Sequence, residues 1–194
     1  MPVTLSELAN DFSTSLVRVD SIMPVWPPYQ PGIGPHSEAE AVKLITKDMQ
    51  ASHPERYASI ALGAQYPERQ RQRCDLVIGE PAEWAVEVKP LRLLGDNGKL
   101  NDNMLMHVLS PYPAHRSAVT DVTKLRTSHF DCHLGILIYA LDYEDWPMEP
   151  AIQAFEALAV RRASLLDRVV VDFHGLVHPV HQRGGVYAWE IGGE

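Results

Sequence analysis

The sequence lacks the long apolar run that a membrane-spanning helix requires. Such a helix needs about 18 to 20 consecutive, mostly apolar residues, and no stretch of this kind occurs in the 194 residues. The N-terminal residues also lack a basic region followed by an apolar core, which is the pattern of a secretory signal. We therefore expect a cytoplasmic protein with no membrane partner.

Cysteine and positive charge are scarce as well. Cys74 and Cys132 each stand at the edge of an apolar run, which favours reduced core thiols over a disulfide framework. Lysine and arginine number 17 against 25 aspartate and glutamate residues, and the net charge is -8. Coating nucleic acid by bulk electrostatics needs clustered basic residues, so this balance argues against such a protein. It leaves a nuclease open, because metal-binding carboxylates are themselves negative.

Several catalytic signatures are also missing. The sequence has no glycine-rich loop followed by Lys-Ser or Lys-Thr, which excludes a P-loop nucleotide hydrolase, and it has no Gly-x-Ser-x-Gly elbow. Two groups among the nine histidines have the proximity of zinc ligands: His129 with Cys132 and His133, and His174 with His178 and His181. Neither group has the paired spacing of a zinc motif, so loop and strand-edge positions explain these histidines better.

What the sequence contains is the composition of an ordinary globular protein. Its residues are 45% hydrophobic and 22% charged, and a chain of this length can bury a sizeable core. We expect a single domain over residues 1–194. An N-terminal helix and a proline-rich segment would cover 1–36, the core 37–163, and a closing strand pair 164–194.

The spacing of apolar residues predicts an α/β protein. Helices are expected over 5–17, 37–51, 117–128 and 151–163, and strands over 57–66, 74–79, 83–93, 133–141, 168–176 and 185–191. Residues 24–35 include five prolines and are expected to form a loop, in which Trp26 and Tyr29 anchor the chain or stack on a base. The stretch from 95 to 113 is expected to be irregular.

The helix at 37–51 has a carboxylate on its core-facing side. Ser37 begins the helix, and Glu40 three residues later completes a capping box. With helical spacing, Glu38 lies in line with Val42 and Ile45, whereas Glu40 lies on the opposite side. Glu38 either has a function on this buried face or simply complements the helix dipole while it stays solvated.

A second feature is the pair of strands between residues 74 and 93. Strand geometry sends Glu87 and Lys89 to one face, and Asp75 arrives from the neighbouring strand. These three groups could converge, so that a hard divalent cation finds oxygen ligands and a water molecule finds an ammonium group. The alternative is the solvated face of an ordinary amphipathic strand, with Glu87 and Lys89 forming a surface pair.

The order of the elements, Asp75, and the run Glu87-Val88-Lys89 together resemble the PD-(D/E)XK nuclease superfamily over roughly residues 37–160. The resemblance implies a restriction-endonuclease-like core, with a mixed central sheet of about four strands flanked by helices. The C-terminal strand pair would be an addition to it. Cys74 stands where the name of the superfamily has proline, a position that shapes the backbone and provides no ligand.

The resemblance also implies roles for the residues of the two strands. Asp75 and Glu87 would ligate Mg²⁺ or Mn²⁺, and the backbone carbonyl of Val88 would complete part of the coordination shell. Lys89 would orient or deprotonate the attacking water.

Further residues follow from the helices of that superfamily. Glu38 matches an acidic residue on its first core helix, with Glu40 as the alternative. Lys124, with Asp121 as the weaker alternative, would contact the substrate phosphate.

Arginines precede the second strand at alternate positions. Arg69, Arg71 and Arg73 would lie on one side of an extended segment, where they could bind a backbone phosphate. A solvated basic edge that discourages aggregation is an equally good interpretation.

The sequence therefore predicts a metal-dependent endonuclease that hydrolyses DNA phosphodiester bonds. One alternative is a catalytically idle subunit of a larger defence or repair complex, which binds nucleic acid or a partner protein. An RNA nuclease with the same site is another. Cutting both strands of a duplex would call for a homodimer, for which the closing strand pair could serve.

Overall fold

The computed structural model describes residues 2–23, 25, 30–101 and 104–192 of the chain. Within these ranges, helices and strands are mixed along the chain, which makes an α/β fold. The elements are α1 (Leu5–Ile22), α2 (Glu38–Ser52), β1 (Ile60–Tyr66), β2 (Arg69–Ile78), β3 (Trp84–Leu91), α3 (Met106–Leu109), a 3-10 helix (Pro113–His115), α4 (Ala118–Arg126), β4 (His133–Leu141), α5 (Glu149–Ala159), β5 (Val169–His174) and β6 (Arg183–Glu190).

Six strands form one open, mixed sheet in the order β1-β2-β3-β4-β6-β5. Neighbouring strands are antiparallel except β3 and β4, which run parallel. The prediction of a sheet of about four strands is wrong, because the extra C-terminal pair joins it: β6 pairs with β4 along its length and extends the same sheet. An apolar strand such as β4 needs partners at both edges, and the periodicity within a strand does not identify them.

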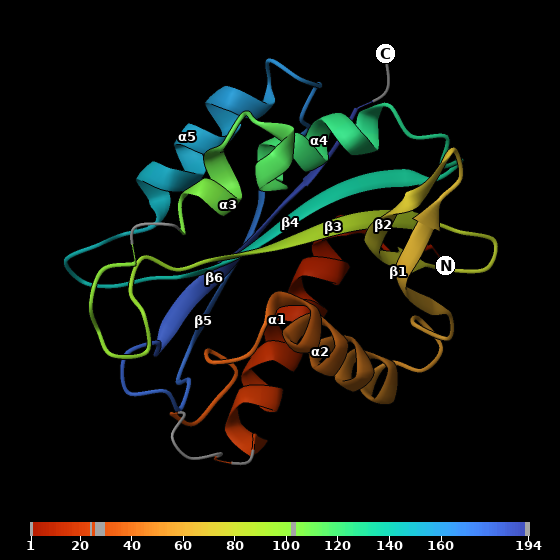
Figure 1. The fold of residues 1–194 in the computed structure, drawn as a ribbon. Helices are drawn as coiled ribbons and strands as arrows, with labels where there is room; N and C mark the ends of the chain where they lie inside the picture. Colours follow the sequence, from red (N-terminus) through yellow and green to blue (C-terminus); the bar gives the residue numbers. More distant parts are fainter. Residues whose placement is uncertain (1, 24, 26–29, 102–103, 193–194) are drawn as a thin grey trace.

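Helices cover both faces of this twisted sheet (Figure 1). Helices α1 and α2 lie on one face, and α3, α4 and α5 lie on the other. The side chains of α1 that face the sheet are fully buried, among them Leu8, Phe12 and Leu16. Strand β4 is buried from Gly135 onward, as its apolar sequence predicts. The central strands β3 and β4 are therefore shielded from solvent on both faces.

Helix α1 is longer than the sequence predicted, and polar residues on its buried face explain the difference. It continues to Ile22 instead of ending at residue 17. Asp20 is 1% exposed, and its carboxylate accepts hydrogen bonds from the backbone N–H of Ile33 at 2.8 Å and of Val177 at 2.6 Å. Because a buried aspartate interrupts the apolar pattern, periodicity alone ends the helix too early.

Other predicted elements are present with shifted ends. Strand β4 has the predicted bounds, whereas β2 begins at Arg69 instead of residue 74, and a short helix, α3, lies in the stretch that was expected to be irregular. Cys74 and Cys132 are free thiols, as predicted. Trp26 and Tyr29 fall outside the described residues. Among the helices that the structure describes, none has the length and apolar character to cross a membrane.

Trp189 gives a test of the packing between β6 and α5. Its side chain is 1% exposed, its ring centroid lies 4.9 Å from that of Phe155, and its Nε1 donates to Glu156 Oε1 at 2.9 Å. Trp189→Ala leaves a large cavity and should lower the free energy of unfolding by about 3 to 5 kcal/mol. Chemical denaturation followed by circular dichroism measures this loss. Trp146→Ala, at a side chain that is 45% exposed, should change stability by no more than about 0.5 kcal/mol. Equal effects of the two substitutions would contradict the packing.

Candidate active site

Strands β2 and β3 separate at Asp75, and this fork opens the candidate site. The two strands pair only where residues 76–78 of β2 face residues 84–86 of β3. Beyond this point Asp75 Oδ2 accepts a hydrogen bond from the backbone N–H of Val88 at 2.8 Å. A carboxylate thus satisfies a donor of β3 that would otherwise bond to a neighbouring strand. This bond fixes Asp75 beside the half of β3 that leaves β2.

Glu87 and Lys89 point to the same side of β3, as strand periodicity predicts. Glu87 Oε1 lies 2.5 Å from Lys124 Nζ of α4 and accepts a hydrogen bond from the hydroxyl of Tyr66 at 2.6 Å. The surface-pair interpretation does not describe these side chains, because Glu87 is 1% and Lys89 is 7% exposed. Both are core groups of the fork.

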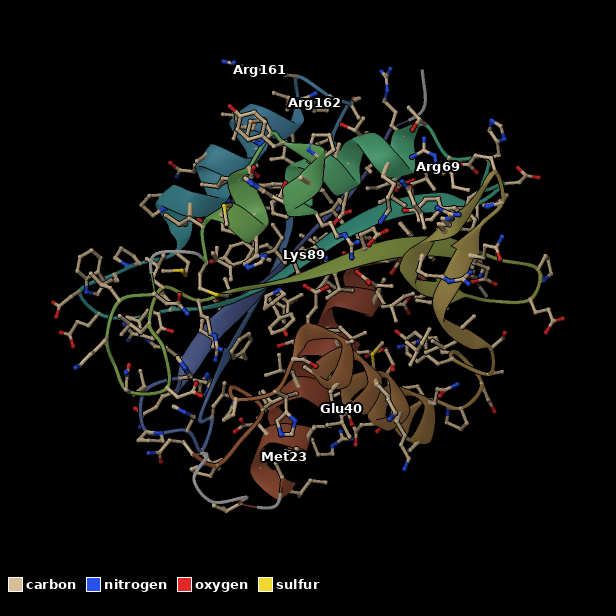
Figure 2. All side chains as sticks on the ribbon, in the orientation of Figure 1. Met23, Glu40, Arg69, Lys89, Arg161 and Arg162 are labelled. Carbon is tan, nitrogen blue, oxygen red and sulfur yellow. The ribbon has the colours of Figure 1, made fainter. Side chains whose placement is uncertain are left out.

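The ammonium of Lys89 contacts carboxylates from three elements. Its Nζ lies 2.9 Å from Glu38 Oε1, 3.4 Å from Asp121 Oδ2 and 3.7 Å from Asp75 Oδ2. It also donates to the backbone carbonyl of Val88 at 3.0 Å. One side chain of β3 therefore joins α2, β2 and α4. Figure 2 shows Lys89 over the middle of the sheet, between the two layers of helices.

The structure distinguishes the two glutamates of α2. Glu38, in the first turn, reaches Lys89, whereas Glu40 lies lower on α2, away from Lys89, in Figure 2. Glu40 pairs with Lys43 at 3.5 Å on the solvent-exposed side. The predicted capping box is half formed, since Ser37 Oγ accepts from the Glu40 N–H at 3.4 Å. Glu38 is the helix residue that belongs to the fork.

The sequence analysis gave Asp121 of this cluster only as an alternative and did not identify Tyr66. Asp121 was the weaker alternative to Lys124, but α4 brings both into the site, with Asp121 Oδ1 lying 3.2 Å from Lys124 Nζ. Tyr66 stands at the end of an apolar strand, where nothing in the local sequence indicates a site. Its hydroxyl is available to Glu87 only because β1 pairs with β2.

Four carboxylates and two ammonium groups share this buried space, and the excess of negative charge changes their pKa values. Burial raises the pKa of Glu87 well above its ordinary value, and the carboxylates of Asp121 and Asp75 raise it further. Burial also raises the pKa of Asp121 and that of Glu38, even though Lys89 favours their charged forms. Asp121 Oδ2 is buried and accepts no hydrogen bond from the described residues.

The pKa values of the two lysines are raised as well, which for a lysine favours the charged form. Burial by itself would lower the pKa of Lys89, but Asp121, Asp75 and Glu38 outweigh it and raise the pKa above the ordinary value. The pKa of Lys124 is raised for the same reason, with Glu87 as its main partner. Both side chains are therefore ammonium ions at neutral pH.

The carboxylates fit a divalent cation by their chemistry and their number. Asp75 lies near enough to Glu87 that its carboxylate is one cause of the raised pKa of Glu87. These two carboxylates, together with an Asp121 oxygen that accepts no hydrogen bond from the described residues and pairs with Lys89 at 3.4 Å, form an oxygen-rich group. The carbonyl of Val88, predicted as a third ligand, accepts a hydrogen bond from Lys89, and its second lone pair leaves that prediction open.

A cavity of about 840 Å³ opens above this group and has a basic lining. The predicted phosphate-binding residues Arg71 and Arg73 line it, as does Arg69. Arg116 and Arg162, which the sequence analysis missed, line it from the loop before α4 and the segment after α5. Arg116 has φ of 47°, and it is the one non-glycine residue with a positive φ among those described. Strained backbone of this kind is frequent at functional sites.

The structure brings two histidines together with an aspartate, a grouping that differs from both groups considered in the sequence analysis. Asp96, His178 and His181 each place one potential ligand atom within 4.8 Å of the others. His178 Nδ1 accepts from the backbone N–H of Val180 and of His181, so its Nε2 carries the hydrogen and offers no lone pair to a metal. Arg92 Nη1 already lies 3.0 Å from Asp96 Oδ1. We interpret Asp96 and His181 as hydrogen-bonded partners at 3.3 Å, while His178 Nε2 is buried without a hydrogen-bond partner among the described residues.

Comparison with known proteins identifies no relative. No family model, no curated protein and no solved structure matches this chain. Its function must therefore be inferred from the fork, from the ionisable groups of the fork and from the basic cavity.

The buried histidine pair predicts a loss of stability in mild acid. Burial, His178 and Arg92 lower the pKa of His181 to about 4, and burial lowers that of His178. Below pH ~6.5 the unfolded chain binds protons that the folded chain does not, so this contribution is complete above pH ~6.5 and is lost towards pH 4. For His181 it is on the order of 3 kcal/mol.

Denaturation of the wild type and of His181→Gln at several pH values tests whether His181 causes this loss of stability in acid. The substitution should flatten the fall in stability between pH ~6.5 and 4.5. His174→Gln, at an exposed position on β5, should keep the wild-type slope. Parallel curves for the wild type and His181→Gln would show that folding does not lower the pKa of His181.

Proposed function

We propose that the protein is a metal-dependent endonuclease that hydrolyses DNA phosphodiester bonds with Mg²⁺ or Mn²⁺. The observation that supports this most directly is the fork between β2 and β3, which gathers Asp75, Glu87 and Lys89 with Glu38 at the floor of a cavity lined by arginines. Carboxylates, an ammonium group and guanidinium groups are the groups that phosphodiester hydrolysis requires.

The connection of the strands supports the same proposal. An antiparallel meander, β1-β2-β3, is followed by α4 and by β4, which is parallel to β3. This is the arrangement that the resemblance to the PD-(D/E)XK superfamily implies for a restriction-endonuclease-like core. We assign that core to α2 through β4, with β6 and β5 as an extension of its sheet.

The residues of the fork have separate tasks in this proposal. Asp75 and Glu87 hold the cation, with Asp121 available as a further oxygen donor. When bound, the cation supplies a Lewis acid that polarises the phosphoryl oxygen and lowers the pKa of a bound water. Lys89 donates hydrogen bonds to the attacking water and offers a positive charge to the phosphate. Three carboxylates raise the pKa of Lys89 in the cation-free site, which favours an ammonium group that orients the water over a base that deprotonates it.

The positions of Glu38 and Lys124 follow from their contacts. Glu38 holds the ammonium of Lys89 on the cavity side at 2.9 Å, so it is a positioning residue. Lys124 neutralises Glu87 and lines the cavity, where it can contact a phosphate oxygen. Arg71 and Arg73 are exposed on the same cavity and bind the flanking phosphates of the strand.

One observation favours a second candidate function. Lys124 lies 2.5 Å from Glu87, and Lys89 contacts three carboxylates, so protein ammonium groups already neutralise much of the negative charge. A fork that is permanently closed by its own lysines would be a catalytically idle nucleic-acid-binding subunit. Turnover with a divalent cation separates the two functions.

Nuclease assays of paired variants test the site. Lys89→Ala should reduce metal-dependent cleavage of DNA by at least about 100-fold, because it removes the charge that orients the water. Lys43→Ala is the matched control, since Lys43 is exposed on α2, and it should retain wild-type activity. Glu38→Gln should lower activity, whereas Glu40→Gln should not.

Linear, nicked and single-stranded DNA and RNA are incubated with Mg²⁺, with Mn²⁺ and with chelator. Cleavage of RNA alone would make the protein a ribonuclease with the proposed site. Absence of cleavage on all substrates with both metals would favour the idle binding subunit.

Cation binding is also measurable without turnover. A ligand at 100 times its dissociation constant stabilises the folded state by about 2.7 kcal/mol, so saturating Mg²⁺, Mn²⁺ or Ca²⁺ should raise the melting temperature of the wild type. Asp75→Asn and Glu87→Gln should abolish this rise, because each removes a negatively charged oxygen ligand. Asp172→Asn, at an exposed position on β5, should leave it unchanged. An unaltered rise in Asp75→Asn would place the cation elsewhere.

A further inference from the structure

Strand β5 forms one edge of the sheet, at the end opposite to β1 (Figure 1). It pairs with β6 in a continuous register from Val169 to His174. Along its other side, the backbone N–H and C=O groups of β5 make no hydrogen bond with any residue that the structure describes. Unpaired strand groups of this kind are a template for pairing with another chain.

The backbone of β6 shows which groups of β5 point outward. The Asp142 N–H donates to the Arg183 carbonyl at 2.9 Å, so the odd-numbered residues of β6 bond towards β4. Because the bonding direction alternates along an antiparallel strand, the even-numbered residues of β6 bond towards β5, where they face residues 169, 171 and 173. Val170 and Asp172 therefore direct their backbone donors and acceptors out of the sheet.

The two edges of the sheet differ in how regularly they could pair with another strand. In β1, the register shifts between Gln65 and Tyr66, and Gly63 has a φ of 57°. A bulge and a left-handed residue interrupt a regular ladder of hydrogen bonds. Strand β5 has neither feature within its bounds, and it begins with consecutive valines, which favour strand pairing. Of the two edges, β5 is the one suited to association.

The side chains on the face of β5 that α5 approaches have a self-complementary order of charge. Arg168 directly precedes β5, and by strand periodicity it shares this face with Val170 and Asp172. Arg168 Nη1 donates to Glu149 of α5 at 2.9 Å, which leaves other guanidinium donors for a second acid. Asp172 is exposed and makes no hydrogen bond or ion pair with the described residues. Val170, which is 43% exposed, thus stands between a cation and an unpaired anion.

This order of charge selects one register for two antiparallel copies of β5 around a two-fold axis. A register centred on Asp172 places two aspartates opposite each other, and one centred on Val171 places Val170 opposite Asp172. A register centred on Val170 places each Arg168 opposite Asp172 of the second copy. Opposite charges that face each other across strands stabilise the pairing, whereas like charges destabilise it. The charges therefore favour the register centred on Val170.

We propose that β5 is a dimerisation edge, which pairs antiparallel with β5 of a second copy of this chain in the register centred on Val170. The pairing extends the sheet into the second copy, and it is isologous, so it closes without leaving a β5 edge exposed. Facing residues of antiparallel neighbours point to the same face of a sheet, so α5 lies on the same side of the joint sheet in both copies. This inference is independent of the proposed nuclease function.

Sedimentation equilibrium of the full chain between about 1 and 300 µM measures the association. An interface of one strand from each copy belongs to the small, weak class below roughly 1,200 Å², so we expect a reversible dimer with a dissociation constant on the order of 10 µM. A wild type that stays monomeric throughout this range would overturn the proposal.

Matched substitutions on the two edge strands locate the interface. Val170→Lys places two ammonium groups opposite each other at the centre of the pairing and should weaken the dimer at least about fivefold. Leu62→Lys is the control, because it places a lysine on β1 at a side chain that is 42% exposed, and it should leave the dissociation constant unchanged. Circular dichroism and thermal melting establish that both variants are folded. A dimer that survives Val170→Lys, or that is lost in Leu62→Lys, would overturn the assignment to β5.

Disulfide cross-linking tests the register. Residues of a hydrogen-bonded antiparallel pair have Cα atoms about 5.5 Å apart, within the range that a disulfide spans. Val170→Cys should therefore form a covalent dimer under mild oxidation, whereas Val171→Cys, which faces Val169 of the second copy, should not. Non-reducing electrophoresis measures the yield, with the wild type as the background from Cys74 and Cys132. A yield from Val171→Cys equal to or above that from Val170→Cys would overturn the proposed register.

Discussion

The contacts of Lys89 are the interaction on which the arrangement of the site depends. Its ammonium group is the common partner of Glu38, Asp75 and Asp121, which come from α2, β2 and α4. Without that charge, three carboxylates would remain close together in a poorly solvated space, and an uncompensated buried charge costs several kcal/mol. Such a cluster is a poor way to stabilise a core, since apolar side chains of similar volume are commonly as good or better. Its retention is easier to understand as a requirement of chemistry than of folding.

The sheet makes this cluster possible by failing to pair along its whole length. Residues 76–78 of β2 hold β3 in register, and the side chain of Asp75 then takes over a backbone donor of β3. The remaining half of β3 is left with β4 as its partner, because β2 does not pair with it. Helices on the two faces then contribute side chains. Glu38 lies in the first turn of α2, where the helix dipole favours a carboxylate, and α4 provides Asp121 and Lys124.

The sequence predicted those parts of the site that depend on local periodicity. Strand spacing placed Glu87 and Lys89 together, and helical spacing placed Glu38 on the core-facing side of α2. The early start of β2 was missed because Arg69 to Arg73 alternates arginine with glutamine and has no apolar face. Arg116 and Arg162 come from segments far apart in the chain, and no local pattern relates them. His178 and His181 lie in the loop between β5 and β6, as expected, but the sequence did not show that tertiary contacts bury them.

The choice between Asp121 and Lys124 shows a second limit of prediction from the sequence. The two residues are three positions apart on α4, so helical geometry puts them on the same face and cannot rank them. The structure uses both, because β3 presents a side chain of each charge to α4: Glu87 lies close to Lys124, and Lys89 lies close to Asp121. The opposite charges of facing side chains on α4 and β3 therefore decide which residue contacts which. This complementarity belongs to the two elements together and not to either one alone. A similar complementarity explains why Glu38 and not Glu40 enters the fork, since only Glu38 faces an ammonium group that its own helix does not provide.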